Sequence, residues 1–201
     1  MDAQQKKEDQ RTVYLIAAAL AVVVAGSSYL GYRHRVQAPK RLEAATRTWF
    51  DSPRMMAKIL MERHGPPSVI TPQAVTWYER QPWKRITVHG DSPDKYLEHT
   101  VGYQARPAAV AALRKFGEGV RVDLVAEEIS ARSNAEALNT LALNLAHDIA
   151  SGKRGPREAR AFYSKTLKLA AAGKTSPYME YLRFEHYRFV PQERIPSLIG
   201  Y

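Results

Sequence analysis

An uncharged segment near the start of the chain most constrains what it can fold into. Residues 12–32 read TVYLIAAALAVVVAGSSYLGY and contain no Asp, Glu, Lys or Arg. At a rise of about 1.5 Å per residue, a helix of about twenty residues spans the ~30 Å hydrocarbon core of a bilayer. A helix also satisfies its backbone hydrogen bonds internally, which lipid requires. The segment therefore predicts a transmembrane helix that anchors the chain.

The same segment limits what the anchor does inside the membrane. It has no histidine and no charged side chain, so it offers no axial ligand to a pigment or haem and no path for a proton or ion. Its small residues allow another helix to approach closely; they are Gly26, Ser27, Ser28 and Gly31. We expect the helix to anchor the chain and to pack against a neighbouring helix.

A cleavable signal peptide is the alternative for this region. Lys6, Lys7 and Arg11 precede an apolar run, which is the secretory pattern. However, the apolar run continues past Ala25 to Tyr32, and no clean small-x-small cleavage site precedes the arginines that follow. These two features favour an anchor that stays on the chain.

Cations flank the segment on both sides. They are Lys6, Lys7 and Arg11 before it, and Arg33, Arg35, Lys40 and Arg41 after it. The positive-inside rule favours a cytoplasmic C-terminal domain by a margin of a single residue. A single N-terminal span followed by a long domain more often exports that domain. We therefore expect a bacterial inner-membrane protein with a periplasmic domain, and a cytoplasmic domain is the alternative.

The composition bounds the remaining chemistry. The formal net charge is +10 and the pI about 9.8, so some face is electropositive and attracts anionic lipid, an acidic protein or nucleic acid, or is an ordinary basic surface. Contact with anionic lipid headgroups is predicted for the cations after the segment, Arg33, Arg35, Lys40 and Arg41. The chain has no cysteine, which excludes disulfides, a thiolate nucleophile and cysteine-ligated metal or haem.

The chain after the segment alternates helical and strand patterns and is long enough for one domain. Helices are predicted over residues 40–48, 53–64, 107–116, 134–150 and 156–169. Strands are predicted over residues 68–71, 74–79, 84–89, 100–104 and 120–125. The predicted fold class is α+β: one N-terminal transmembrane helix, then a single small antiparallel sheet packed with helices, and a C-terminal aromatic arm.

Two helices carry specific expectations. The spacing of Ser133 and Glu136 predicts a capping box at the start of the helix over residues 134–150. In the helix over residues 53–64, the residues expected to face the core are Met55, Met56, Ile59 and Leu60. The resulting boundaries are an N-terminal tail (1–11), the transmembrane helix (12–32), a juxtamembrane linker and helix (33–52), the α+β globular domain (53–173) and the arm (174–201).

The arm is rich in aromatic residues and arginines. Those predicted to bind a partner are Tyr178, Tyr181, Phe184, Tyr187, Arg188, Phe189 and Tyr201. An arm that packed on nothing would expose a large apolar area, and aromatics with arginine are enriched in the cores of interfaces. The arm therefore either wraps its own domain or binds another chain.

No catalytic, cofactor-binding or metal-binding residue is predicted. The sequence lacks G-x-S-x-G, G-x-x-x-x-G-K-[ST] and G-x-G-x-x-G, the motifs of serine hydrolases, P-loop NTPases and dinucleotide enzymes. Its histidines lack H-x-x-x-H spacing, and His89 with His99 across a hairpin would make a weak metal site. His147 and Asp148 are adjacent on a helix, so they do not face each other as an acid and base pair.

A basic sheet face is the alternative site. It would bind a soluble anionic ligand, on a tethered envelope domain or enzyme, through Trp83, Lys84, Arg85 and His89. Nucleic acid is not expected, because strand aromatics such as Trp77 more often belong to a core than to a stacking platform.

Four stretches carry a resemblance to known proteins: RHGPPSVITP (63–72), VTWY (75–78), PWKRITV (82–88) and ALNLAHDIASGKR (142–154). Through them, residues 55–163 resemble bacterial membrane-tethered envelope proteins of unassigned activity. The layout also resembles an accessory subunit of a bacterial photosynthetic reaction-centre and light-harvesting complex. Neither resemblance carries known catalytic residues. We therefore expect a non-enzymatic accessory subunit that stabilises a membrane complex, binds other membrane protein subunits and holds no cofactor.

Overall fold

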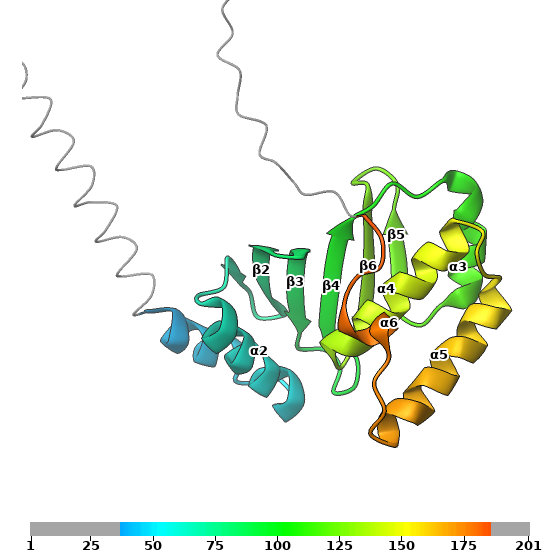
Figure 1. Ribbon diagram of the computed structural model, residues 1–201. Coiled ribbons are helices and arrows are strands. Elements are labelled where there is room, and N and C mark those ends of the chain that lie inside the picture. The colour runs from blue at the N-terminus through cyan, green and yellow to red at the C-terminus, as the bar shows by residue number, and fades with distance from the viewer. Residues whose placement is uncertain (1–36, 186–201) are drawn as a thin grey trace, which may run out of the picture.

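The computed structural model describes residues 37–185, which form a six-stranded antiparallel sheet packed with helices (Figure 1). The strands are β1 (Val69–Ile70), β2 (Ala74–Arg80), β3 (Trp83–His89), β4 (Leu97–Gly102), β5 (Val120–Asp123) and β6 (Glu128–Ser133). Residues 37–46 are helical and are followed by α2 (Asp51–His64), the 3₁₀ turn η1 (Pro107–Ala109), α3 (Val110–Phe116), α4 (Glu136–Ala150), α5 (Pro156–Ala171) and α6 (Pro177–Glu180). The strand order is β1-β2-β3-β4-β6-β5. The expected α+β class with an antiparallel sheet is thus confirmed.

The strand register places the apolar side chains on one face of the sheet. Trp77 lies opposite Ile86, and Ile86 lies opposite His99 on the next strand. All three side chains are buried. α2 packs against β2 and β3, whereas α4 packs against β4, β5 and β6. Leu60 of α2 and Leu141 of α4 join the same hydrophobic core, so both helices stabilise the sheet from its apolar face.

The alternate positions of the strands are polar and pair with one another. The hydroxyl groups of Thr76 and Thr87 are hydrogen-bonded across β2 and β3 at 3.2 Å. Thr100 of β4 lies between Arg85 of β3 and Ser130 of β6 in the register. An antiparallel sheet permits this separation of apolar and polar faces, because successive side chains point to opposite sides.

The helix of residues 37–46 is attached to the sheet rather than extended from it. Leu42 and the following Trp49 are buried members of the core. The indole N–H of Trp49 donates to the carbonyl oxygen of Pro72 at 2.7 Å. Its ring occupies the space that a side chain at Gly90 would fill. Part of the predicted juxtamembrane segment therefore belongs to the folded domain.

The sequence does not predict β6, which lies between β4 and β5. In β6, Ile129 and Ala131 are buried on the apolar face, and Ser130 and Arg132 alternate with them. Only Ile129 has a strong strand preference, so pairing with β4 decides the conformation of this segment. β4 also begins earlier than predicted, at Leu97, which is buried in the core.

The predicted capping box at the start of α4 is wrong. Ala135 precedes the helix, and no side chain caps it. The carboxylate of Glu136 instead accepts hydrogen bonds from Trp83 and Arg63. The hydroxyl of Ser133 bonds the backbone of Ala135. Tertiary contacts of Glu136 thus replace the local bond that the spacing predicts.

The predicted core face of α2 is only partly correct. Leu60 and Ala57 are buried, and Met56 packs partly against the core. Met55 is 60% exposed and Ile59 is 40% exposed. The apolar residues of α2 spread over more than one side of the helix, and the sheet covers only the side that contains Ala57 and Leu60.

Several predictions concern residues beyond the described range. Between residues 37 and 185, no helix combines the length and the apolar character that crossing a bilayer requires. The predicted transmembrane helix 12–32 lies outside this range and stays a prediction. Also outside it are Gly26, Ser27, Ser28, Gly31, Arg33, Arg35, Tyr187, Arg188, Phe189 and Tyr201. Lys40 and Arg41 lie within it and are exposed.

Candidate binding groove

The described part of the arm, residues 174–185, is held against α4 by one buried side chain. The amide nitrogen of Asn144 donates to the carbonyl oxygens of Tyr178 at 3.0 Å and Tyr181 at 2.8 Å. Its amide oxygen accepts the backbone N–H of Arg183 at 2.7 Å. Because an asparagine side chain both donates and accepts, it satisfies three backbone groups of the arm at once.

A second attachment lies at the end of α4. Asp148 accepts hydrogen bonds from the hydroxyl of Tyr178 at 2.8 Å and from the guanidinium of Arg154 at 2.9 Å. The ammonium of Lys153 lies 3.2 Å from its other oxygen. Burial on its own raises the pKa of Asp148, but these hydrogen bonds outweigh burial and hold the pKa below its ordinary value. The ionised carboxylate therefore ties the arm to α4.

An aromatic cluster forms the third attachment. The ring of Phe184 stacks on His147 of α4, with 4.8 Å between centroids, and meets Tyr103 edge-on at 5.4 Å. A 3.1 Å hydrogen bond joins the hydroxyl of Tyr103 to Nδ1 of His147. Burial lowers the pKa of His147 below its ordinary value. The ring is thus neutral near pH 7 and serves as packing surface for the arm.

These attachments place the described residues of the predicted partner-binding set. Tyr178 and Phe184 pack partly against the core of their own domain. Tyr181 is 55% exposed. The arm therefore wraps its own domain as far as residue 185, and binding of another chain by these residues stays a prediction.

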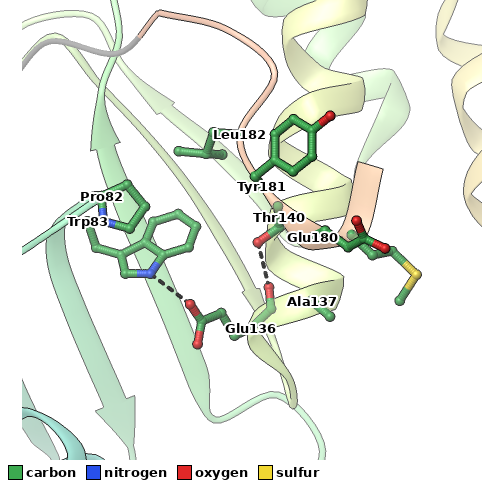
Figure 2. A pocket seen from close by; sticks show the side chains of 9 residues that line it. Pro82, Trp83, Glu136, Ala137, Thr140, Glu180, Tyr181 and Leu182 are labelled. Atoms are coloured by element: carbon green, nitrogen blue, oxygen red, sulfur yellow. Dashed lines mark hydrogen bonds between the residues drawn. The ribbon is translucent and has the colours of Figure 1, made fainter. Parts of the chain in front are cut away.

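Where the arm meets α4 and the β2–β3 hairpin, the surface forms a groove of about 530 Å³ (Figure 2). It is lined by Pro82, Trp83, Glu136, Ala137, Thr140, Met179, Glu180, Tyr181 and Leu182. Most of these side chains are apolar, and Glu136 and Glu180 supply carboxylates. The hydroxyl of Thr140 donates to the backbone of its own helix at 3.0 Å. The groove therefore suits an apolar group with an attached cation.

Glu136 connects three elements at the edge of this groove. One carboxylate oxygen accepts the indole N–H of Trp83 at 3.1 Å, and the other accepts a guanidinium N–H of Arg63 at 3.0 Å. The side chain remains 42% exposed. Each carboxylate oxygen has two lone pairs, so Glu136 retains acceptor capacity for a bound cation.

His99 lies in the core beside Trp83, with 4.3 Å between the ring centroids. Its Nδ1 accepts the amide N–H of Asn139 at 2.9 Å, whereas its buried Nε2 has no partner. Burial, with the nearby charges of His64 and Arg63, lowers the pKa of His99 to about 3. His99 is therefore neutral and supports the floor of the groove.

The basic residues of the predicted anionic-ligand face are paired with carboxylates of their own domain. Trp83 is only 4% exposed and contacts α4. Lys84 and Arg85 each lie 2.9 Å from a carboxylate oxygen of Glu128. Nε2 of His89 lies 3.0 Å from a second carboxylate. An anionic ligand would have to compete with these internal carboxylates.

Sequence reasoning missed two residues of this region, Asn144 and Glu136. Asn144 lies within the apolar stripe of α4, and a buried amide needs hydrogen-bond partners. Its position in the sequence therefore indicates a residue that binds another segment of the chain. The role of Glu136 depends on tertiary contacts that no local pattern reveals. Among residues 37–185, no group of three His, Asp or Glu side chains is arranged to hold a metal ion.

Comparisons with known proteins give no family for this chain. Neither protein-family models, nor curated proteins, nor solved structures provide a match. The function is therefore argued from the groove and the sequence.

Proposed function

We propose that this chain is a non-enzymatic accessory subunit that is anchored in the membrane by residues 12–32 and stabilises a complex of membrane proteins. The observation that carries the proposal is the groove between β3, α4 and the arm. It exists because Asn144 and Asp148 hold the arm against α4. The subunit would use this groove to hold a segment of a neighbouring protein.

The chemistry of the groove selects the partner segment. Pro82, Met179 and Leu182 offer apolar surface, and Glu136 and Glu180 offer negative charge. The chain as a whole carries a formal charge of +10, so the two glutamates make the groove a locally negative region of a positively charged protein. A partner segment with an apolar residue next to a lysine or arginine matches both properties.

The proposed kind of complex rests on the uncharged segment and on a resemblance in layout. The uncharged segment contains no histidine and no charged side chain to ligate a pigment, so the subunit would position other subunits rather than carry a chromophore. The resemblance in layout to an accessory subunit of a photosynthetic reaction-centre and light-harvesting complex names one class of assembly in which such a subunit works.

The test fills the groove without altering the anchor. The full chain is extracted from its native membranes in mild detergent, and its complexes are separated by size. We expect a stoichiometric membrane complex for the natural chain and loss of that complex for Ala137→Trp. The matched control is Ala161→Trp, at an exposed position of α5. A monodisperse monomer of the natural chain, or equal retention of both tryptophan variants, would refute the proposal.

A charge variant tests the expected cation in the partner. Glu180 is exposed and lines the groove, so Glu180→Lys should leave the fold intact and weaken the complex by roughly tenfold, as loss of one charged contact at an interface does. Glu180→Gln should have a smaller effect, because it removes attraction without adding repulsion. If Glu180→Lys strengthens the complex, the partner segment is anionic.

A further inference from the structure

The side of α2 that faces away from the sheet has an unusual number of exposed apolar side chains. Met55 and Ile59 are 60% and 40% exposed, and they lie one helical turn apart. Phe50, immediately before the helix, is 51% exposed. We call Phe50, Met55 and Ile59, with the cations described next, the α2 outer face. Neighbouring exposed apolar side chains, here Met55 and Ile59, are a feature of contact surfaces.

Basic residues accompany the apolar ones. Arg47, Arg54 and Lys58 line the same hollow of about 550 Å³ as Met55. Two acidic residues, Glu43 and Asp51, also line it. Asp51 is paired with Arg54. Arg47 and Lys58 are exposed, so the α2 outer face combines apolar side chains with cations on long, flexible stems.

The position of this face in the chain limits what can cover it. The predicted transmembrane helix ends at residue 32, and the described helix is already present at residue 37. The five steps from residue 32 to residue 37 cover at most about 18 Å, since an extended chain covers roughly 3.5 Å per residue. The start of the helix of residues 37–46 would therefore lie near the bilayer surface, where Arg33 and Arg35 already predict anionic lipid. α2 shares a hollow with that helix, since Glu43 and Met55 both line it.

We propose that the α2 outer face docks onto the surface of a bilayer that contains anionic lipid, an inference that rests on the membrane anchoring in the proposed function. Phe50, Met55 and Ile59 would enter the boundary between headgroups and acyl chains, and Arg47 and Lys58 would contact the headgroup phosphates. The flexible stems of these cations allow them to reach the headgroups while the apolar side chains are buried. Docking would fix the orientation of the sheet, and with it the groove, relative to the membrane.

The test uses the absence of cysteine from the chain. Met55→Cys in the full chain is labelled with an environment-sensitive fluorophore and reconstituted in vesicles of phosphatidylcholine and phosphatidylglycerol. A second preparation contains lipid with a nitroxide on its acyl chains. The matched control is Val125→Cys, which is 96% exposed in the turn between β5 and β6, at the opposite edge of the sheet from β1 and β2.

We expect the nitroxide lipid to reduce fluorescence at position 55 by roughly two-fold or more, as for a group at the acyl boundary, and to leave position 125 unchanged. Adding Lys58→Glu to Met55→Cys should reduce this quenching, with circular dichroism as the check of folding. Flotation with the vesicles but no quenching at position 55 overturns the docking and leaves the anchoring intact. Failure to float refutes the anchoring. Equal quenching in vesicles of phosphatidylcholine alone overturns the role of anionic lipid.

Discussion

The side-chain oxygen of Asn144 accepts the backbone N–H of Arg183 at 2.7 Å, and this contact joins a core helix to the arm. The same side chain donates to two carbonyl groups of the arm. Asn144 is only 1% exposed. A buried amide with all these partners is costly to replace, because each partner would be left unsatisfied. Asn144 is thus one of the residues of α4 that determine the path of the arm, together with Asp148 and His147.

Asn144→Leu should release the arm from α4. Loss of its hydrogen bonds should reduce the free energy of unfolding by about 2–3 kcal/mol. Hydrogen exchange should accelerate over residues 177–185 and remain slow in the strands. Asn134→Leu, at an exposed position before α4, is the control. Unchanged exchange in the arm of Asn144→Leu would show that the aromatic contacts of Phe184 suffice.

Tyr178→Phe should weaken the second attachment of the arm. Removing the hydroxyl that donates to Asp148 should cost about 1–2 kcal/mol, since the acceptor is charged. The pKa of Asp148, which this bond helps to lower, should rise toward its ordinary value of 3.8. A carboxyl with a lowered folded-state pKa stabilises the fold above its unfolded pKa and loses that effect as pH falls through the folded pKa. The variant should therefore lose less stability in acid.

NMR titration of the Asp148 carboxyl measures this change directly. Tyr181→Phe is the matched control, because Tyr181 belongs to the same arm and is 55% exposed. An equal change in the pKa of Asp148 in both variants would contradict a specific role of the Tyr178 hydroxyl.

The sequence predicts the elements of this fold better than their contacts. α5 and the hairpin strands follow clear periodic patterns, and the structure contains them close to the predicted bounds. β6 is missed because its strand conformation comes from pairing with β4, a partner distant in sequence. The exposed side of α2 is misjudged because periodicity identifies apolar residues but not which of them the sheet covers.

The sequence predicts the residues of the groove even less well than it predicts the contacts of the fold. Trp83 lies at the start of β3, Glu136 at the start of α4, and Leu182 in the arm. No spacing along the chain relates these residues, and the predicted capping box even assigns Glu136 a local role. The strand register, the hydrogen bond of Trp83 to Glu136 and the attachments of the arm to α4 bring the three together.

His99 should make the fold sensitive to acid. Burial, aided by the charges of His64 and Arg63, lowers the pKa of His99 to about 3, from 6.5. Between these pH values the unfolded chain binds the additional proton, so stability falls as pH falls below 6.5. From pH 7 to pH 5 the loss due to His99 should be about 2 kcal/mol.

His99→Leu should remove this part of the pH dependence. Urea unfolding at pH 7 and at pH 5 gives the free energy of unfolding of each chain at both pH values. The loss of this free energy from pH 7 to pH 5 should be smaller in the variant. His64 and His147 are present in both chains, so their contributions to the pH dependence of stability cancel in the comparison. An identical pH dependence would mean that His99 can be protonated within the folded core.

Gly90→Ala should loosen the N-terminal helix from the sheet. A methyl group at position 90 would overlap ring atoms of Trp49. Trp49 cannot move freely, because it is buried and its indole N–H is bonded to the carbonyl oxygen of Pro72. Overpacking of this kind should lower the free energy of unfolding by about 1–3 kcal/mol.

Chemical denaturation measures that loss, with Gly155→Ala as the control. A methyl group at Gly155 meets no atom within 4 Å. Gly155 is the N-cap of α5, where glycine is preferred to alanine, so the control should lose about 0.5–1 kcal/mol, less than Gly90→Ala. The helix of residues 37–46 precedes Trp49, so Gly90→Ala should also increase hydrogen exchange in that helix more than in β4. Equal stability of the two alanine variants would mean that the indole moves aside without loss, and that its bond to Pro72 does not hold the helix in place.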